Sequence, residues 1–431
     1  MPDPAWLDRH FPRYTDFDPL VPIWCVTPDD AMGGSFHRFF DTSPISPSGR
    51  LLAFTRMPQE DHAPAPGEAA HIGIVDLATG EQRLVAETRG WEPQMGANVN
   101  WGVDDTQLIF NDVDPTTWNA FAVRCNVATG DKTRLGGPVY HVSPDGHTAA
   151  GSNPIPMRRT QPGYGVMIPE EHVPRFVGPQ TDDGLWLTDT QTGESRLALS
   201  IYDAITRATP AFELEDRTAA ECEIYGFHAK WSPDGSQLIW TLRFFRDDGT
   251  SRFGVQGTPD IRFTVLTVTP DGQRVRNAVP TRYWRRRGHH INWTPDSRGL
   301  SMNLQLEDDG PLRLVGCAVD GSGLGPIVGG VVGSGHPTVH PTANHVLTDV
   351  YAHEPFAFGD GTTPLRWIAL DTGGEQTIAR FPSRTAAQKH DGVMRLDPHP
   401  AWDRTWRWVT FNAMIDGTRR VMLADMQPLL G

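Results

Sequence analysis

Only four cysteines occur in the 431 residues and no two form a CxxC pair, so neither a disulfide framework nor a cysteine-based metal motif is expected. No run of 18 apolar residues is present, which argues against a membrane-spanning helix. The first residues, MPDPAWLDRHFPRY, lack the apolar core of a secretory signal, which favours a cytoplasmic protein. The net charge of −14 argues against a nucleic-acid partner, because phosphate binding needs a basic face.

Turn-forming residues are plentiful instead. The chain has 43 glycines, 37 prolines and 14 tryptophans, a composition that suits an all-β protein with many tight turns. One turn motif recurs along the chain. It is clearest in YGFHAKWSPDG (225–235), and related copies are SPISPSG, VYHVSPDG, GHHINWTPDS and PHPAWDRT. A motif that recurs in this way indicates repeated structural units.

Seven units can be traced, each with about four short strands of alternating polarity that are separated by turn signals. No helical periodicity competes with this pattern. We therefore predict an all-β fold, a seven-bladed β-propeller with four-stranded antiparallel blades. The propeller is expected to cover residues 36–431, and residues 1–35 are expected to form an N-terminal extension of the kind that closes the last blade.

Alignment of the units exposes a histidine position. The aligned position lies three residues before the tryptophan, or its Ile or Val equivalent, that precedes each turn. In unit order the residues there are Thr42, Asn98, Val139, His228, His290, His336 and His399. The first strand of a propeller blade lines the central channel, so these side chains are expected to converge near its axis.

Three interpretations of the four histidines stay open at this stage. Each could simply pack under its tryptophan and hydrogen-bond to the next blade. Together they could bind a divalent metal such as manganese, zinc or calcium, with His290, His336 and His399 as candidate ligands. They could also transfer protons near neutral pH. His289 and His340 lie close in sequence and are candidate supporting residues.

Arginines and aromatic residues add to this pattern. Arg158 and Arg159 lie in a long insertion in the third unit (154–182), and three further arginines (285–287) precede His289. Guanidinium groups pair bidentately with carboxylates, so these arginines are candidate carboxylate ligands, although solvated turns would also explain them. Aromatic side chains beside such donors are common in sugar sites, and core packing is the alternative. The candidates are Trp91, Tyr140, Tyr164, Tyr283 and Trp284.

On these residues the seven units resemble the seven-bladed propeller polysaccharide lyases. The second half is similar to the intracellular oligogalacturonate lyases, through His-x-x-Trp before the turns and through Gly335-His336-Pro337. That resemblance implies a manganese ion held by His336 and His399, with His290 as the base candidate. Asp397 and Ala401 stand near the places of a glutamine and a further histidine in that family.

The third unit resembles the ulvan lyase and rhamnose–glucuronate lyase branch. In VYHVSPDGHTAAGSNPIPMRR, Tyr140 matches a proton-transfer tyrosine and Arg158 matches an arginine that neutralises a carboxylate. The PGYG segment (162–165) is similar as well. Asn98 or Asn100 stands where that branch has a catalytic histidine in its second blade.

The two resemblances imply a lyase that cleaves a uronate-containing oligosaccharide or polysaccharide by β-elimination. The alternative is a TolB-like propeller that binds a glycan or a protein without catalysis. A glycoside hydrolase would need two facing carboxylates, and no Asp or Glu recurs at the channel position. The catalytic candidates are Asn98, Tyr140, Arg158, His228 and His290, and the substrate-binding candidates are Asn100, Trp101, Arg159, Tyr164 and His289.

Overall fold

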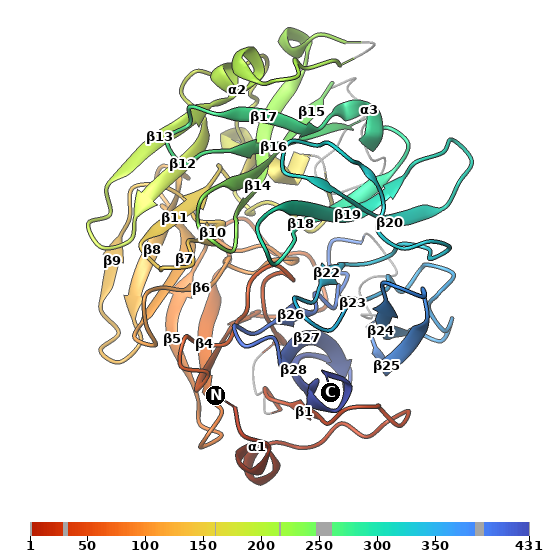
Figure 1. The fold of residues 1–431 in the computed structure, drawn as a ribbon. Coiled ribbons are helices and arrows are strands. Elements are labelled where there is room, and N and C mark those ends of the chain that lie inside the picture. Colours follow the sequence, from red (N-terminus) through yellow and green to blue (C-terminus); the bar gives the residue numbers. More distant parts are fainter. Residues whose placement is uncertain are drawn as a thin grey trace.

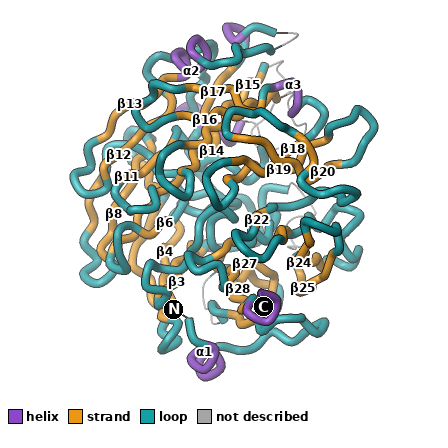
Figure 2. Tube along the Cα trace, viewed as in Figure 1, coloured by secondary structure: helices purple, strands orange, loops and turns teal. Residues whose placement is uncertain are grey.

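The computed structural model describes residues 2–28, 33–159, 161–214, 217–246, 261–383 and 392–430. Its strands form seven four-stranded antiparallel sheets arranged as blades around a central channel (Figure 1). The predicted seven-bladed propeller is confirmed. Figure 2 shows that strands and loops make up almost all of the described chain and that the labelled helices lie at the periphery. No helix among the described residues is long and apolar enough to cross a membrane.

Blades one to four follow one another in sequence, and each runs from an inner strand beside the channel to an outer strand. Blade one contains β2 (Ser35–Phe36), β3 (Leu51–Arg56), β4 (Ala70–Asp76) and β5 (Gln82–Thr88). Blade two contains β6 (Asn100–Trp101), β7 (Gln107–Val113), β8 (Ala120–Asn126) and β9 (Lys132–Arg134). Blade three contains β10 (His141–Val142), β11 (Thr148–Gly151), β12 (Gly184–Asp189) and β13 (Ser195–Ser200). Blade four contains β14 (Glu223–Trp231), β15 (Leu238–Phe245), β16 (Ile261–Val268) and β17 (Val275–Val279).

The remaining blades keep the same order, except that the last one borrows a strand from the N-terminus. Blade five contains β18 (Gly288–Trp293), β19 (Gly299–Gln305), β20 (Leu312–Ala318) and β21 (Gly325–Pro326). Blade six contains β22 (Thr338–Val339), β23 (His345–Thr348), β24 (Thr362–Ala369) and β25 (Glu375–Pro382). Blade seven contains β26 (Ala401–Trp402), β27 (Trp408–Ile415), β28 (Thr418–Asp425) and β1 (Ile23–Cys25).

Short helical segments occupy the connections and the termini. Among the described residues the α-helices are α1 (Pro4–His10), α2 (Ile201–Arg207), α3 (Thr281–Trp284) and α4 (Gln427–Leu430). The described 3₁₀ turns, at Pro156–Arg159, Glu170–His172 and Ala219–Glu221, lie in the third blade's insertion and before β14. The helix α3 lies directly before β18, so it helps to position the first residues of blade five.

The recurring turn is held by its own side chains. In blade four, the Ser232 hydroxyl donates to Asp234 Oδ1 at 2.6 Å, and the same oxygen accepts the Ser236 backbone N–H at 3.0 Å. Gly235 has a φ of +72°, a conformation that glycine adopts without the penalty of a side chain. The Ser-Pro-Asp-Gly sequence thus specifies a tight turn between the first two strands of a blade, on one face of the ring.

Two tryptophans of the motif tie adjacent blades together. The Trp101 indole donates from Nε1 to the Pro44 carbonyl at 2.7 Å, and the Trp293 indole donates to the Lys230 carbonyl at 3.0 Å. Both rings are buried between blades. Each bond runs from one inner strand to the preceding blade, so these tryptophans serve the scaffold, and the opposite ends of the inner strands carry the histidines.

Candidate functional site

The four aligned histidines meet around one phenylalanine. Phe39, which follows the inner strand of blade one, is fully buried in the channel. Its ring centroid lies 5.0 Å from that of His228, 5.9 Å from His290, 5.3 Å from His336 and 4.6 Å from His399. The predicted convergence is confirmed. The hydrophobic ring at its centre was not predicted, and it keeps the imidazoles at the walls of the channel.

Two of these histidines form a candidate metal group with a carboxylate. Ligand atoms of His336, Asp397 and His399 all lie within 4.8 Å of one another, and all three residues are buried. The Nε2 atoms of both histidines have no hydrogen-bond partner among the described residues. A buried polar atom without a partner is costly, and neutral imidazole nitrogen with carboxylate oxygen suits a divalent transition metal. This group could therefore hold a metal ion.

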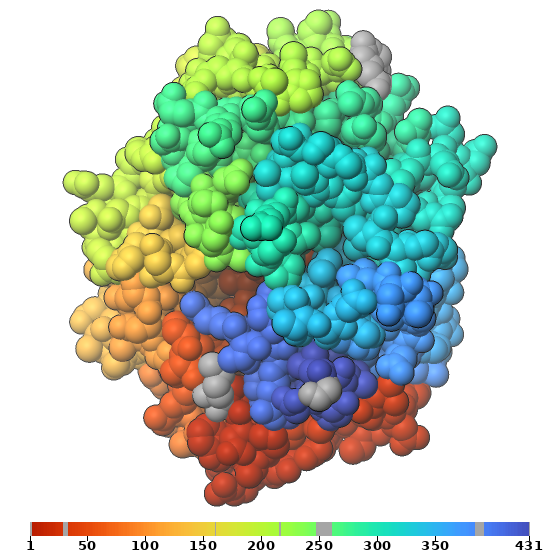
Figure 3. Space-filling view, in the orientation of Figure 1, coloured from red at the N-terminus to blue at the C-terminus, as the bar shows by residue number. Residues whose placement is uncertain are grey.

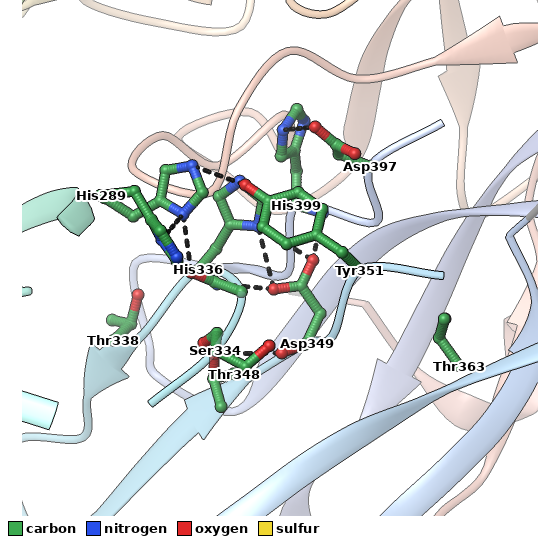
Figure 4. Close-up of polar contacts among 12 residues, drawn as sticks. His289, Ser334, His336, Thr338, Thr348, Asp349, Tyr351, Thr363, Asp397 and His399 are labelled. Atoms are coloured by element: carbon green, nitrogen blue, oxygen red, sulfur yellow. Dashed lines mark hydrogen bonds and ion pairs between the residues drawn. The ribbon is translucent and has the colours of Figure 1, made fainter. Parts of the chain in front are cut away.

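Asp349 holds the two histidines of the candidate metal group in position (Figure 4). Its carboxylate lies 2.9 Å from His336 Nδ1 and accepts the His336 backbone N–H at 2.6 Å. The His399 backbone N–H also donates to it, at 3.3 Å. A carboxylate that accepts from Nδ1 leaves the Nε2 lone pair of His336 available, which is the arrangement found behind many metal-bound histidines. One side chain thus fixes the segments that carry both histidines.

His290 is held in a different network, outside the candidate metal group. Its Nδ1 lies 2.6 Å from the Gly335 carbonyl oxygen, so this nitrogen carries the proton. Its Nε2 is then an acceptor for the Tyr351 hydroxyl at 3.0 Å. The His290 ring also stacks on His336, with centroids 3.7 Å apart. Burial, more than the neighbouring histidines, holds the pKa of His290 well below its usual range, so this imidazole is neutral.

A pocket of about 230 Å³ opens beside these residues. Its walls come from β14, β15 and β16 of blade four, from α3 and β18 at the start of blade five, from Gln161 and Tyr164 of the blade-three insertion and from Tyr351 of blade six. His289, His290 and Tyr351 form one part of the wall, and Tyr164, Arg243 and Gln161 are further polar lining residues. A pocket that combines aromatic surfaces with a few polar groups is typical of a small-molecule site.

Arg243 is the cationic group of this pocket. It lies near the end of β15 and is 5% exposed, and its Nη2 donates to Gln161 Oε1 at 2.9 Å. The guanidinium lies over the ring of Phe227 at 3.3 Å and over that of Phe263 at 4.8 Å. Nε and Nη1 have no hydrogen-bond partner among the described residues. Burial lowers the pKa of Arg243 only to about 10, so it stays charged at neutral pH.

Tyr140 and His228 lie deeper in the channel. The Tyr140 hydroxyl donates to Asp41 at 2.7 Å, and Asp41 also pairs with Lys230 at 3.0 Å and with Arg38 at 3.3 Å. Burial alone would raise the pKa of Asp41, but these two cations hold it below its usual range. His228 lines the pocket and lies 4.8 Å from the Tyr140 ring, and its Nε2 is buried without a hydrogen bond to any described residue.

The blade-three insertion contributes one of its three candidates to the pocket. Arg159 forms a bidentate ion pair with Glu223, at 2.6 and 2.9 Å, and Glu223 also pairs with Arg175, at 2.8 Å. Arg158 is buried and donates to the Ile168 carbonyl, and burial lowers its pKa. Neither arginine lines the pocket. Tyr164 does, and its ring packs 5.3 Å from Phe227.

The candidates of blade two lie away from this pocket. Asn98 is buried with a φ of +53°, and its carbonyl accepts from Asn100 Nδ2 at 2.7 Å. Asn100 and Trp101 line a second pocket, of about 330 Å³, on the face that carries the tight turns. Figure 3 shows a hollow near the centre of that face. The structure therefore separates the blade-two candidates from His290 and Arg243.

The two candidate supporting residues make different contacts. His289 supports the group of aligned histidines as expected, with its Nδ1 2.8 Å from His290 Nδ1. His340 does not, because it lies in the turn of blade six and its Nε2 hydrogen-bonds at 3.0 Å with the carbonyl of Trp406, in the turn of blade seven. The arginines at 285–287 are exposed after α3, and Arg286 pairs with Asp308 at 2.5 Å.

Repeat alignment missed Arg243, Asp349 and Tyr351 because it followed only the first strand of each blade. All three lie at or just after the end of a second strand, which reaches the same face of the ring as the histidines. A usable signal was present for Arg243, since it is the one charged residue within the apolar strand LIWTLRFF. Phe39 carried no signal, because nothing in its sequence context distinguishes it from a core residue.

Comparisons with known proteins agree with the architecture. No protein-family model and no curated protein sequence matches the chain. Among solved structures, an oligogalacturonate lyase in complex with manganese superposes with a TM-score of 0.60, at 15% identity over 96% of each chain. An oligogalacturonate lyase from Vibrio parahaemolyticus gives 0.60, at 14% identity over 98% of each chain. A putative TolB from Agrobacterium tumefaciens gives 0.39, at 16% identity over 80% of this chain and 94% of the other. At such identities the likeness shows the fold alone.

Proposed function

We propose that this protein is a lyase that cleaves a uronate-containing oligosaccharide by β-elimination in the pocket beside His290. One observation carries the proposal. A buried, charged Arg243, two of whose nitrogens have no hydrogen-bond partner among the described residues, lines the same pocket as the neutral His290, next to a buried His/Asp/His group. The likeness in fold to oligogalacturonate lyases, one of them solved with manganese, supports the same reaction class.

The reaction needs a carboxylate to be neutralised before a proton can leave. The C5 proton of a uronate is weakly acidic, and it becomes removable when positive charge stabilises the developing enediolate. Arg243 supplies such charge, and its Nε and Nη1 have no hydrogen-bond partner among the described residues. Its aromatic neighbours Phe227 and Phe263 exclude water from the guanidinium, which strengthens the interaction.

The candidate metal group provides a second source of charge. Its ligands would be His336, His399 and Asp397, with Asp349 orienting His336. A bound divalent cation supplies Lewis-acid stabilisation of a carboxylate. His290 is the proton acceptor, because burial keeps it neutral and its Nε2 carries the lone pair toward Tyr351.

The test is a search for the unsaturated product. Oligosaccharides from glucuronan, pectic, ulvan and gum-type polymers are incubated with the purified protein and manganese, and ultraviolet absorbance is followed. We expect absorbance to rise as the conjugated 4,5-unsaturated uronate forms. Flat traces on all substrates, together with measurable binding of one of them, would favour a non-catalytic binding propeller instead.

Replacement of Arg243 tests the assignment of the pocket. We expect Arg243→Gln to lower kcat/KM by about 10²- to 10³-fold, the usual cost of removing one group that stabilises developing charge. Arg298→Gln, at an exposed position on the turn face, is the matched control and should behave as wild type. Circular dichroism and thermal melts verify folding. Full activity in a folded Arg243→Gln protein would place the chemistry elsewhere.

A further inference from the structure

One wall of the pocket, formed by blade four, has polar side chains that lack a partner. Among the described residues, the buried polar side-chain atoms that line the pocket without a hydrogen bond are His228 Nε2, Thr241 Oγ1, and Nε and Nη1 of Arg243. All three side chains are only 5–6% exposed. On the other walls, the Tyr351 hydroxyl and Gln161 Oε1 are already hydrogen-bonded. Because buried polar atoms are nearly always paired in folded proteins, this wall is suited to a polar ligand.

A β-bulge brings the histidine and the threonine of this wall together. The register of the pairing between β14 and β15 shifts between Gly226 and Ala229, so that two residues of β14, Phe227 and His228, lie opposite the single residue Thr241. A bulge of this kind redirects the side chains of the bulged strand and is common beside active sites. Both bulged residues line the pocket, as Thr241 does.

Thr241 and Arg243 belong to the same face of β15. Residues two apart in a strand point to the same side of the sheet, and both of these side chains line the pocket. The pocket, of about 230 Å³, is smaller than the usual range for drug-sized ligands. A single sugar residue therefore fills it, and the group that contacts Thr241 and His228 belongs to the same sugar as the group that contacts Arg243.

The next blade shows that the bulge itself does not need a threonine. The register of β18 and β19 shifts in the same way between His289 and Asn292, so that His290 and Ile291 lie opposite the single residue Met302. The Met302 side chain is fully buried and apolar. An apolar residue thus supports the same backbone geometry. The hydroxyl at the equivalent position of blade four is explained better by contact with a ligand than by the fold.

We propose that Thr241 and His228 bind a free hydroxyl group of the uronate whose carboxylate is held by Arg243, and that they restrict the substrate to uronates in which this hydroxyl is unsubstituted. This inference rests on the proposed lyase function and names its substrate class. The C3 hydroxyl is the free hydroxyl nearest to the carboxylate, because C4 carries the bond that is broken. A sugar hydroxyl both donates and accepts, and a threonine hydroxyl beside a neutral imidazole nitrogen provides for both.

The binding pair acts on specificity because its atoms are buried. A hydroxyl that is missing from the sugar leaves Thr241 Oγ1 and His228 Nε2 unpaired, as they are in the free protein. A site that is built to hydrogen-bond a substrate hydroxyl discriminates strongly against an analogue without it. Both residues are positioning residues in this scheme, since they bind the sugar and exchange no proton with it.

The first experiment removes the hydroxyl from the substrate. Wild-type protein with added manganese is assayed on the uronate oligomer that it cleaves fastest, and on the same oligomer with hydrogen in place of the C3 hydroxyl at the cleaved uronate. We expect kcat/KM to be about 10- to 100-fold lower on the deoxy oligomer. Equal values would overturn this inference and leave the lyase proposal intact. Absence of product from every uronate oligomer would overturn the lyase proposal and, with it, this inference.

The second experiment separates binding of the hydroxyl from a structural role. Thr241→Val keeps the shape of the side chain and removes its hydroxyl. We expect a loss of about tenfold or more in kcat/KM on the parent oligomer and no further loss on the deoxy oligomer. Thr377→Val, at an exposed position of β25, is the matched control and should equal wild type on both. Equal losses of Thr241→Val on both oligomers, or no loss on the parent, would overturn the assignment.

The histidine of the pair is tested in the same way. We expect His228→Gln to lose activity on the parent oligomer and to match wild type on the deoxy oligomer. Thermal melts verify that each variant is folded. A loss of the same size on both oligomers in a folded His228→Gln protein would assign the imidazole to the chemical step and overturn its place in the binding pair.

Discussion

At the scale of single residues, burial sets the state of the candidate metal group. The three ligand residues have almost no solvent contact, and solvent therefore satisfies few of their polar atoms. His336 is oriented by Asp349, which accepts from its Nδ1 and its backbone N–H. Because outer partners fix both the tautomer and the angle of a ligand, their loss weakens metal binding even when every ligand is present.

This arrangement predicts how metal affinity responds to substitution. We expect Asp349→Asn to weaken manganese binding by about 10- to 100-fold, because the side chain keeps its shape but loses its charge. His399→Gln removes a ligand and should reduce binding further. Isothermal titration and elemental analysis of the purified protein measure the effect, and His345→Gln is a control at the far end of blade six. Unchanged affinity in both site variants would mean that the group holds no metal.

At the scale of elements, the first part of the blade-three insertion is a strap that reaches across to other blades. The strap is defined here as residues 161–168. Gln94 of the loop before blade two donates its backbone N–H to the Gly163 carbonyl at 3.1 Å, and Arg395 before blade seven donates to the Pro162 carbonyl at 2.6 Å. The Glu92 carboxyl accepts the Gly165 N–H. These contacts hold the strap in place, and the strap contributes Gln161 and Tyr164 to the wall of the pocket.

The strap contact made by Glu92 predicts a pH dependence of stability. Burial raises the pKa of Glu92 to about 8. The folded chain therefore retains a proton that the unfolded chain releases between about pH 5 and about pH 8, and over this range the group lowers the free energy of unfolding by about 1.4 kcal/mol per pH unit. We expect Glu92→Gln, which keeps the acceptor for Gly165, to gain stability relative to wild type as pH rises.

Urea unfolding at several pH values measures this difference. It should be small near pH 5 and should increase by about 1.4 kcal/mol per pH unit toward pH 8. Glu87→Gln, an exposed position on β5, is the control and should show no such trend. A constant difference between Glu92→Gln and wild type at all pH values would show that Glu92 is ionised in the folded protein.

At the scale of the whole molecule, the ring is closed by pairing the two ends of the chain. The N-terminal strand β1 pairs antiparallel with β28, and Trp24 lies opposite Leu423. Trp24 is fully buried, and its ring centroid lies 6.2 Å from that of Trp408. Without β1 the outer edge of β28 would expose unpaired backbone groups and an apolar surface.

Removal of this strand should therefore destabilise all seven blades. We expect deletion of residues 2–26 to lower Tm markedly and to raise light scattering, because the open edge of blade seven can pair with other chains. Differential scanning calorimetry and static scattering measure both effects. Addition of a peptide that spans residues 2–28 should partly restore Tm. A truncated protein with wild-type Tm would show that the ring is closed adequately by the other contacts of blade seven.

Local chemistry in the sequence determined the scaffold. A turn such as Ser232–Gly235 is specified by neighbouring residues, and seven units of alternating strands separated by turns are sufficient to define a propeller. The same repeat located His228, His290, His336 and His399, because equivalent positions in a ring face the same axis. Those inferences needed only short-range patterns and symmetry.

The tertiary structure alone decided which side chains share a pocket. His336 and His340 are four residues apart, yet one faces the channel and the other is bound in a turn. Arg243 and Tyr351 come from different blades to line the same pocket as His290. Arg159 is instead ion-paired with Glu223. The Tyr140 hydroxyl is hydrogen-bonded to Asp41. Such pairings depend on side-chain direction and on distances between remote segments. A local motif contains neither, which is why the sequence specified the ring and its histidines while the folded chain assigned their partners.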